Sequence, residues 1–182
     1  MNAPPGGPGA PPTPTRRRLL LATLLPPLVA AAPAGAEGLP PVNGPVILTV
    51  SGAIRNTNRG DTAVFDREGL ESLGSAGFTT STPWFDGPQR FDGVPMTRLM
   101  EAVGAAGTTV TAIALNDYTT EIPIADFARY NVLLALRRNG AYMPVRDKGP
   151  LFIVYPYDSA PELRGQPYYG RSAWQLARLI VA

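Results

Sequence analysis

The stretch "GFTTSTPWFDGPQRFDGVPM", residues 77–96, begins with β-branched residues and continues through two glycine turns. Threonine suits the pleated, half-buried surface of a sheet, so residues 77–82 predict a strand. The remainder holds proline, glycine and aspartate at short intervals, which predicts a turn-rich loop ending in a Gly-Val-Pro corner. A strand of hydroxyl-bearing residues that opens onto Trp84 is where we expect a ligand to be held.

The residues on both sides of this stretch predict further strands and short helices. Apolar residues at helical spacing indicate a helix over 96–103 that stops at Gly104, with shorter helices at 66–74 and 124–130. The closing residues 172–182 fit a helix by composition, but their β-branched end favours a last strand. Further strands are expected at 45–52, 61–66, 108–115, 119–124, 132–140 and 151–155. The result is an α+β domain with a strand-dominated mixed sheet and short helices.

The composition excludes several kinds of chemistry. The 182 residues include no cysteine and no histidine. A disulfide framework, a zinc site of thiolates or imidazoles, a histidine-held haem and a Ser–His or Cys–His nucleophile pair are therefore excluded. Catalysis would have to rest on Asp, Glu, Tyr, Arg, Ser, Thr or the one lysine, Lys148, or on a bound cofactor.

The N-terminal residues predict an export signal. Residues 1–14 are mostly Pro, Gly and Ala, a composition typical of disorder. Three arginines at 16–18, an apolar stretch over 19–32 and small residues at Ala34 and Ala36 follow in the order of a secretory signal. We expect residues 1–36 to be this signal and its extension, with cleavage after Ala36, and residues 37–182 to form the domain in the periplasm. The arginines resemble a twin-arginine signal; an ordinary secretory signal and an uncleaved anchor are the alternatives.

The charge of the chain depends on that signal. The whole sequence has 16 basic and 14 acidic side chains, and the three arginines at 16–18 belong to the expected signal. Without them the acidic side chains outnumber the basic ones by one. We therefore expect no nucleic-acid partner.

Four segments in order resemble the molybdopterin-binding domain of the sulfite oxidase family. The resemblance extends over residues 46–181 and implies the fold of that domain. The segments are FDGVPMTRLMEAVG (91–104), AIALNDYTTEIPIADF (112–127), VLLALRRNGAYMPVRDKGPLFIVYP (132–156) and SAWQLARLIV (172–181).

The sequence departs from that family at one chemically decisive position. Family enzymes carry a cysteine on the strand before the Phe-x-Gly-Val-Pro corner, and its thiolate is the protein's ligand to molybdenum. The equivalent position here falls near Thr80, Ser81 or Thr82. A hydroxyl is not an easily deprotonated soft ligand, so the resemblance implies a fold without thiolate ligation of molybdenum.

The segments that remain suit the flat ring of a pterin. A carboxylate such as Asp117 can accept both donors of the 2-amino-4-oxo edge, glycine-turn N–H groups can meet its oxo group, and aromatic faces can sandwich the ring. We expect the ligand to be bound by Thr80, Ser81, Thr82, Trp84, Asn116, Asp117, Tyr118, Arg146, Lys148, Gly149, Tyr155, Tyr157 and Arg171.

Structural interpretations of the same residues stay open. Thr80 and Thr82 suit a strand without any ligand, and Trp84 suits a lid on the core. Asp117 and Lys148 both stand in sequences that also fit turns. Arg171 also fits a solvated charge or an ion pair.

The chain also resembles the periplasmic pterin-responsive regulators, in its missing cysteine, its expected export signal and three segments. The segments are TTSTPW (79–84), NDY (116–118) and RDKGPLFIVYP (146–156). That resemblance implies a non-catalytic protein that binds a metal-free reduced pterin. It also implies docking onto the periplasmic region of a membrane enzyme of cyclic diguanylate metabolism. The alternative is an oxidoreductase that holds molybdopterin through its phosphate and dithiolene, without a protein thiolate. A third alternative is an interaction module whose pocket has closed.

Overall fold

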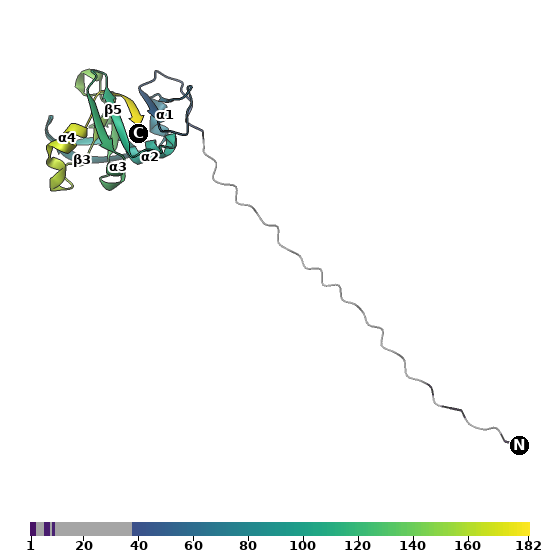
Figure 1. The fold of residues 1–182 in the computed structure, drawn as a ribbon. Coiled ribbons are helices and arrows are strands. Elements are labelled where there is room, and N and C mark those ends of the chain that lie inside the picture. Colours follow the sequence, from purple (N-terminus) through teal and green to yellow (C-terminus); the bar gives the residue numbers. More distant parts are fainter. Residues whose placement is uncertain (3–5, 8, 10–37) are drawn as a thin grey trace. The chain divides into compact units, whose positions relative to one another are not determined.

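A computed structural model describes residues 1–2, 6–7, 9 and 38–182, and the fold is that of residues 38–182 (Figure 1). The expected arginine-rich signal and its cleavage site lie outside the described residues. The predicted boundary after Ala36 therefore stays a prediction.

The first sheet has five strands and joins residues far apart in the sequence. Its order is β2-β1-β10-β5-β6, and β1 and β10 pair in parallel while the other pairs are antiparallel. The predicted last strand is confirmed by β10, which lies between β1 and β5. The strands are β1 (Leu48–Gly52), β2 (Ala63–Phe65), β5 (Thr109–Ala114), β6 (Thr119–Pro123) and β10 (Leu176–Val181).

The second sheet is antiparallel and contains the stretch quoted at the outset. Its order is β3-β4-β7-β8, and β9 also pairs with β7. Two strand-dominated sheets, one of them mixed, confirm the predicted α+β class. The strands are β3 (Ala76–Thr82), β4 (Phe85–Pro95), β7 (Leu133–Arg138), β8 (Ala141–Tyr142) and β9 (Phe152–Val154).

The expected turn-rich loop after residue 82 is wrong, because residues 85–95 form β4, the longest strand of the described domain. This strand pairs with β3 on one side, with Phe78 opposite Phe91, and with β7 on the other. At Gly93, an added Cβ would lie 2.1 Å from the backbone oxygen of Leu134. The glycine that suggested a turn is instead required where two backbones approach closely.

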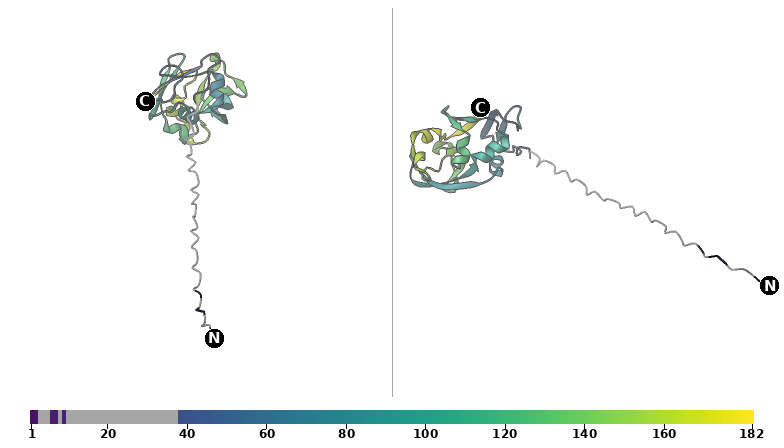
Figure 2. Two further views of the ribbon diagram at one scale, coloured as in Figure 1. Left: turned by 90° about the vertical axis from the view of Figure 1, so that its right-hand side faces the viewer. Right: turned by 60° about the horizontal axis from the view of Figure 1, so that its bottom comes forward.

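The helices are short and lie around the strands, as two further views show (Figure 2). Asp66 caps the first helix by accepting from the Gly69 N–H at 2.7 Å, and Gly104 ends the second in the left-handed conformation (φ 61°). The helix over 166–171 and the two 3₁₀ turns were not predicted. The elements are α1 (Arg67–Ser72), α2 (Met96–Val103), α3 (Ala125–Arg129), α4 (Gln166–Arg171), η1 (Val145–Asp147) and η2 (Pro161–Arg164).

The core takes side chains from both sheets. Leu48 and Leu179 come from the first sheet, and Phe91, Leu134 and Ile153 from the second; all five are fully buried. Among the described residues no helix is long and apolar enough to span a bilayer.

Candidate functional site

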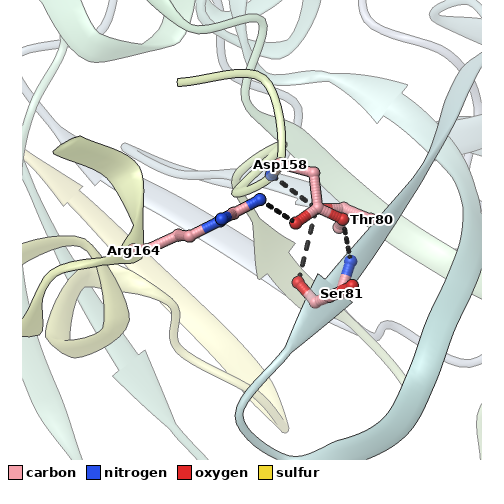
Figure 3. Close-up of polar contacts among 4 residues, drawn as sticks. All are labelled: Thr80, Ser81, Asp158 and Arg164. Atoms are coloured by element: carbon pink, nitrogen blue, oxygen red, sulfur yellow. Dashed lines mark hydrogen bonds and ion pairs between the residues drawn. The ribbon is translucent and has the colours of Figure 1, made fainter. Parts of the chain in front are cut away.

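A carboxylate from a distant loop, that of Asp158, is hydrogen-bonded to the threonine strand β3, as Figure 3 shows. Asp158 accepts the Ser81 N–H at 2.6 Å through Oδ2, and its own N–H donates to the Thr80 hydroxyl at 3.0 Å. Arg164 of η2 donates to Asp158 Oδ1 at 2.9 Å. These four residues form what we call the Asp158 clamp. The Ser81 N–H, ahead of the Ser81 hydroxyl and Arg164, holds the pKa of Asp158 below its usual value.

The clamp occupies the position where the resemblance places the molybdenum ligand. Thr80 is 1% exposed, and its hydroxyl both accepts from Asp158 and donates to the Ser81 carbonyl at 3.3 Å. In the described part of the chain, no three His, Cys, Asp or Glu side chains lie close enough to hold a metal ion. A hydroxyl that already accepts and donates a hydrogen bond is a poor ligand for molybdenum. The residues of this strand therefore do not fit the metal.

Trp84 follows the strand and lies in an aromatic cluster. The Thr82 hydroxyl accepts the Trp84 N–H at 3.3 Å, which fixes the turn between β3 and β4. The indole meets Phe152, Tyr157 and Tyr169 at ring-centroid distances of 5.5, 6.1 and 5.9 Å, each with its plane steeply inclined. Trp84 is thus half-buried against the core and packs against the edges or faces of these rings.

A second tryptophan, Trp174, brings three of the predicted residues together. Its ring centroid lies 5.2 Å from that of Trp84. The Tyr118 ring is nearly parallel to it, inclined by 4° at a centroid distance of 6.5 Å. Lys148 Nζ lies 4.2 Å from its ring centroid. We call Trp174, Tyr118 and Lys148, backed by Trp84, the Trp174 platform. Parallel aromatic faces beside a cation suit a flat, partly anionic ligand.

Lys148 is held in place by its neighbours. Its backbone adopts the left-handed conformation (φ 65°), and its ammonium also lies 5.6 Å from the Phe85 ring. Loss of hydration lowers the pKa of Lys148, Asp147 raises it in part, and Arg138 lowers it further. Gly149, which follows, has no room for a side chain: a Cβ would lie 1.8 Å from the Met143 carbonyl oxygen.

The turn that carries Tyr118 is built by its two preceding residues. Asn116 accepts the Tyr118 N–H at 3.2 Å, and the Tyr118 hydroxyl donates to the Gly170 carbonyl at 2.6 Å. Asp117 has a positive φ of 63°, and its side chain is 91% exposed, 3.9 Å from Arg178. The side chain of Asp117 therefore lies in solvent beside Arg178. Arg146 is exposed on η1.

Tyr155 and Tyr157 belong to the interior, and the partly exposed Arg171 contacts it from the end of α4. Tyr155 is fully buried and donates to Asp126 at 2.9 Å, and Arg171 donates to the same oxygen, Oδ2, at 2.8 Å. We call these three residues the Asp126 centre. Burial, then the Asp126 carboxylate, raises the pKa of Tyr155 far above its usual value. Tyr157, 1% exposed, hydrogen-bonds Ser172.

The structure thus divides eight of the thirteen predicted residues among three places. Trp84, Tyr118 and Lys148 meet at the platform, Thr80 and Ser81 are held by the clamp, and Tyr155 and Tyr157 lie inside, with Arg171 at the Asp126 centre. Four important residues were missed by the sequence reasoning: Trp174, Asp158, Arg164 and Asp126. Trp174 carried a usable signal, since it is one of two tryptophans and directly precedes the last strand. The partners of the other three are 6 to 78 residues away along the chain.

A separate hollow of about 740 Å³ lies at the start of β3. It contains none of the predicted residues and is mainly apolar, with walls that include Phe78, Phe127 and Leu133. Its one cation, Arg129, lies over the Tyr130 ring at 4.9 Å. The platform offers the more specific chemistry, although this hollow is larger than the others described.

Comparison with known proteins gives one family. The family model described as the oxidoreductase molybdopterin binding domain matches residues 66–160, which is more than half of the chain. The matched segment runs from the cap of α1 to the loop that carries Asp158 and includes the clamp strand, Tyr118 and Lys148. No curated protein matches the chain.

Proposed function

The chain belongs to the oxidoreductase molybdopterin-binding domain family, and from that premise we propose that it is a non-catalytic, periplasmic protein that binds a metal-free pterin. One observation carries the proposal. Where the resemblance places a thiolate, Thr80 and Ser81 are tied to Asp158. A buried hydroxyl that already accepts and donates would lose both hydrogen bonds if it turned to a metal, and buried polar groups left without partners are costly.

The Trp174 platform supports a pterin as the ligand. Tyr118 is 46% exposed, so part of its ring is accessible to a flat ligand. Lys148 and Arg146 supply positive charge for an oxo group or an anionic tail. A ligand that reaches further, toward Tyr155 or Arg171, would have to break the Asp126 centre, so we place the ring at the platform.

The biological role follows from the resemblance to cysteine-less periplasmic regulators. In this proposal, the pterin-bound and empty forms differ in their affinity for the periplasmic region of a membrane enzyme of cyclic diguanylate metabolism. The ligand then shifts the population toward one form. The predicted export signal supports the proposed compartment.

The decisive experiment identifies the ligand carried by the natively purified protein. The protein is denatured, the released small molecules are analysed by mass spectrometry, and molybdenum is assayed in parallel. A metal-free pterin near one per chain is the expected result. Molybdenum with molybdopterin at that stoichiometry would establish the oxidoreductase instead, and release of no pterin would favour an interaction module with a closed pocket.

Point variants locate the site. We expect Tyr118→Ala to weaken binding of 6-methyltetrahydropterin at least about tenfold, because stacking on an aromatic ring is worth about 1–3 kcal/mol. Tyr142→Ala is the matched control, since Tyr142 is 40% exposed but packs between Arg67 and Arg137 instead of at the platform. Equal effects of the two variants would show that the pterin ring does not bind at the platform.

Asp117→Ala tests the contact with the amino-pyrimidine edge separately. If Asp117 accepts both donors of that edge, the variant weakens binding by orders of magnitude. If affinity is unchanged, Asp117 serves only the turn and its contact with Arg178.

A further inference from the structure

A second feature beside the platform is an apolar groove bordered by exposed side chains. Val46, Leu115 and Val145 are 36%, 55% and 50% exposed, and all three line one hollow of about 370 Å³. Pro150, Leu176 and Arg178 also line it. We call this hollow the Val145 groove. Large apolar side chains that gather around a concave surface are typical of protein-docking sites.

The charges at the groove are predominantly positive. Arg178 lines it with a side chain that is 58% exposed, and the exposed Arg146 directly follows Val145. Asp147, the nearest acid on η1, is already paired with Arg138 at 2.6 Å, which leaves Asp117, 3.9 Å from Arg178, as the local counter-charge. Residues 38–182 as a whole carry equal numbers of acidic and basic side chains. This positive excess is therefore local, and it favours an acidic occupant.

The groove and the Trp174 platform are joined by one residue. Gln175 follows Trp174 and has a positive φ of 53°. Its N–H donates to the Lys148 carbonyl at 3.1 Å, its Nε2 donates to the Val145 carbonyl at 2.7 Å, and its carbonyl accepts the Leu115 N–H at 2.8 Å. Gln175 is thus hydrogen-bonded to the backbone of two exposed groove residues, Val145 and Leu115, and to that of the platform residue Lys148.

We propose that the Val145 groove is the docking surface for a partner protein that presents an apolar anchor flanked by carboxylates, and that Gln175 couples docking to ligand binding at the platform. The coupling part rests on the proposed pterin-binding function. A ligand that moves Trp174 or Lys148 also moves the carbonyl and N–H groups that Gln175 holds. The positions of Val145 and Leu115 then differ between the two forms, and so does the affinity of the groove.

Binding of labelled peptides tests the groove itself. The probe is a fluorescein-labelled peptide with a central Leu-Phe pair flanked by glutamates, and its twin has lysines in place of the glutamates. We expect the acidic peptide to bind at least about tenfold more tightly than the basic one, with an affinity that falls as salt is raised.

Variants of the groove provide the matched comparison. Leu115→Ser and Val145→Ser should each weaken the acidic peptide at least about tenfold, the loss expected for a hot-spot anchor contact. Ile180→Ser is the control: Ile180 is also an exposed apolar residue, at 39%, and lies on β10 without lining the groove. Failure of both peptides to bind at millimolar concentration, or equal losses in all three variants, would overturn the docking surface. A dimer in light scattering that Leu115→Ser converts to monomer would also overturn it, because the occupant would then be a second copy.

A separate measurement tests the coupling. With 6-methyltetrahydropterin present, the affinity for the acidic peptide should change by about fivefold or more, a typical coupling between sites. Gln175→Gly suits the positive φ and keeps the backbone contacts but removes the bond from Nε2 to Val145. We expect the peptide affinity of this variant to respond less to the pterin than that of the parent, because the link to Val145 is lost while the backbone links remain. An unaltered response would overturn the role of Gln175.

The two proposals fail in different ways. If the pterin does not bind, as measured by calorimetry, the proposed function is lost, while the peptide and groove variants still decide the docking surface. If the pterin binds and the peptides do not, the docking surface is wrong and the proposed function stands.

Discussion

The Trp174 platform and the Asp126 centre contain similar residues in opposite states. Both combine tyrosine rings with a cation, but Tyr155 and Arg171 share one carboxylate oxygen in the interior. At the platform, Lys148 and Tyr118 both lie against Trp174, and among the described residues the nearby Asp147 is paired with Arg138 instead of Lys148.

The difference shows why residue type alone does not define a site. A polar group that is buried and satisfied by its own chain stabilises the fold and is costly to recruit for a ligand. A half-exposed ring and a cation that is not paired with a carboxylate can contact a ligand without breaking a buried ion pair. The Asp126 centre and the Asp158 clamp are both satisfied by their own chain. Of the three places, only the Trp174 platform is suited to reversible binding.

The largest effect is expected when the carboxylate of the Asp126 centre is removed. Asp126→Ala leaves Arg171 and the Tyr155 hydroxyl without their acceptor, and loss of one partner from a largely buried ion pair costs about 3 kcal/mol of unfolding free energy. Urea denaturation measures the loss. Tyr155→Phe is the milder control, expected to cost about 1 kcal/mol because Arg171 keeps its partner. An Asp126→Ala protein as stable as the parent would show that the centre is not a structural unit.

The next effect tests the clamp. Thr80→Val removes the buried hydroxyl that accepts the Asp158 N–H and should cost about 1 kcal/mol, the usual contribution of one hydrogen bond. Thr79→Val, on the exposed face of the same strand, should be close to neutral. Equal stability of the two variants would mean that the Thr80 hydroxyl is available to a ligand, as the platform residues are.

A smaller effect appears only as a dependence on pH. The folded-state pKa of Asp158 lies below its unfolded value, so its ionised form stabilises the fold above about pH 4, and this contribution is lost as the pH falls through the folded pKa. Asp158→Asn should therefore be less stable than the parent at pH 6 and should converge with it in acid. Melting temperatures measured from pH 3 to pH 7 decide this, and a constant difference across the series would contradict it.

The smallest effect sharpens the description of the platform. Because Lys148 is partly desolvated, its pKa is lowered, and its amine becomes neutral at a lower pH than that of a free lysine. The rate of acylation at Lys148, followed by mass spectrometry, should therefore reach its midpoint at a lower pH in the folded protein than in urea. Lys148 is the one lysine, so peptide mapping separates its adduct from that of the N-terminal amine. Identical midpoints would mean that the ammonium is fully hydrated.

The sequence was most reliable where the signal is local. The helix over 96–103 with its glycine stop and the last strand were predicted from periodicity and propensity, and both are confirmed. The strand β4 was missed because its glycines and prolines indicate turns, whereas pairing with β3 and β7 outweighs that local preference.

The candidate site was predicted only in part, for a similar reason. Tyr118 and Lys148 were predicted from short motifs, but the residue that joins them, Trp174, lies 26 residues beyond Lys148 and 56 beyond Tyr118. Asp158 lies 78 residues from Thr80. Contacts at these separations depend on the order of strands in the sheets, which a single sequence does not specify.

The sequence by itself determined the chemistry that is possible: without cysteine or histidine, the common protein ligands for soft metals are missing whatever the fold. It also determined the α+β class, through the alternation of β-branched runs with short amphipathic segments. Only the tertiary structure decided which of the predicted residues are open. Burial and hydrogen-bond partners are set by segments far apart in the chain, so they distinguish Tyr155 from Tyr118 although the sequence predicts both tyrosines as ligands.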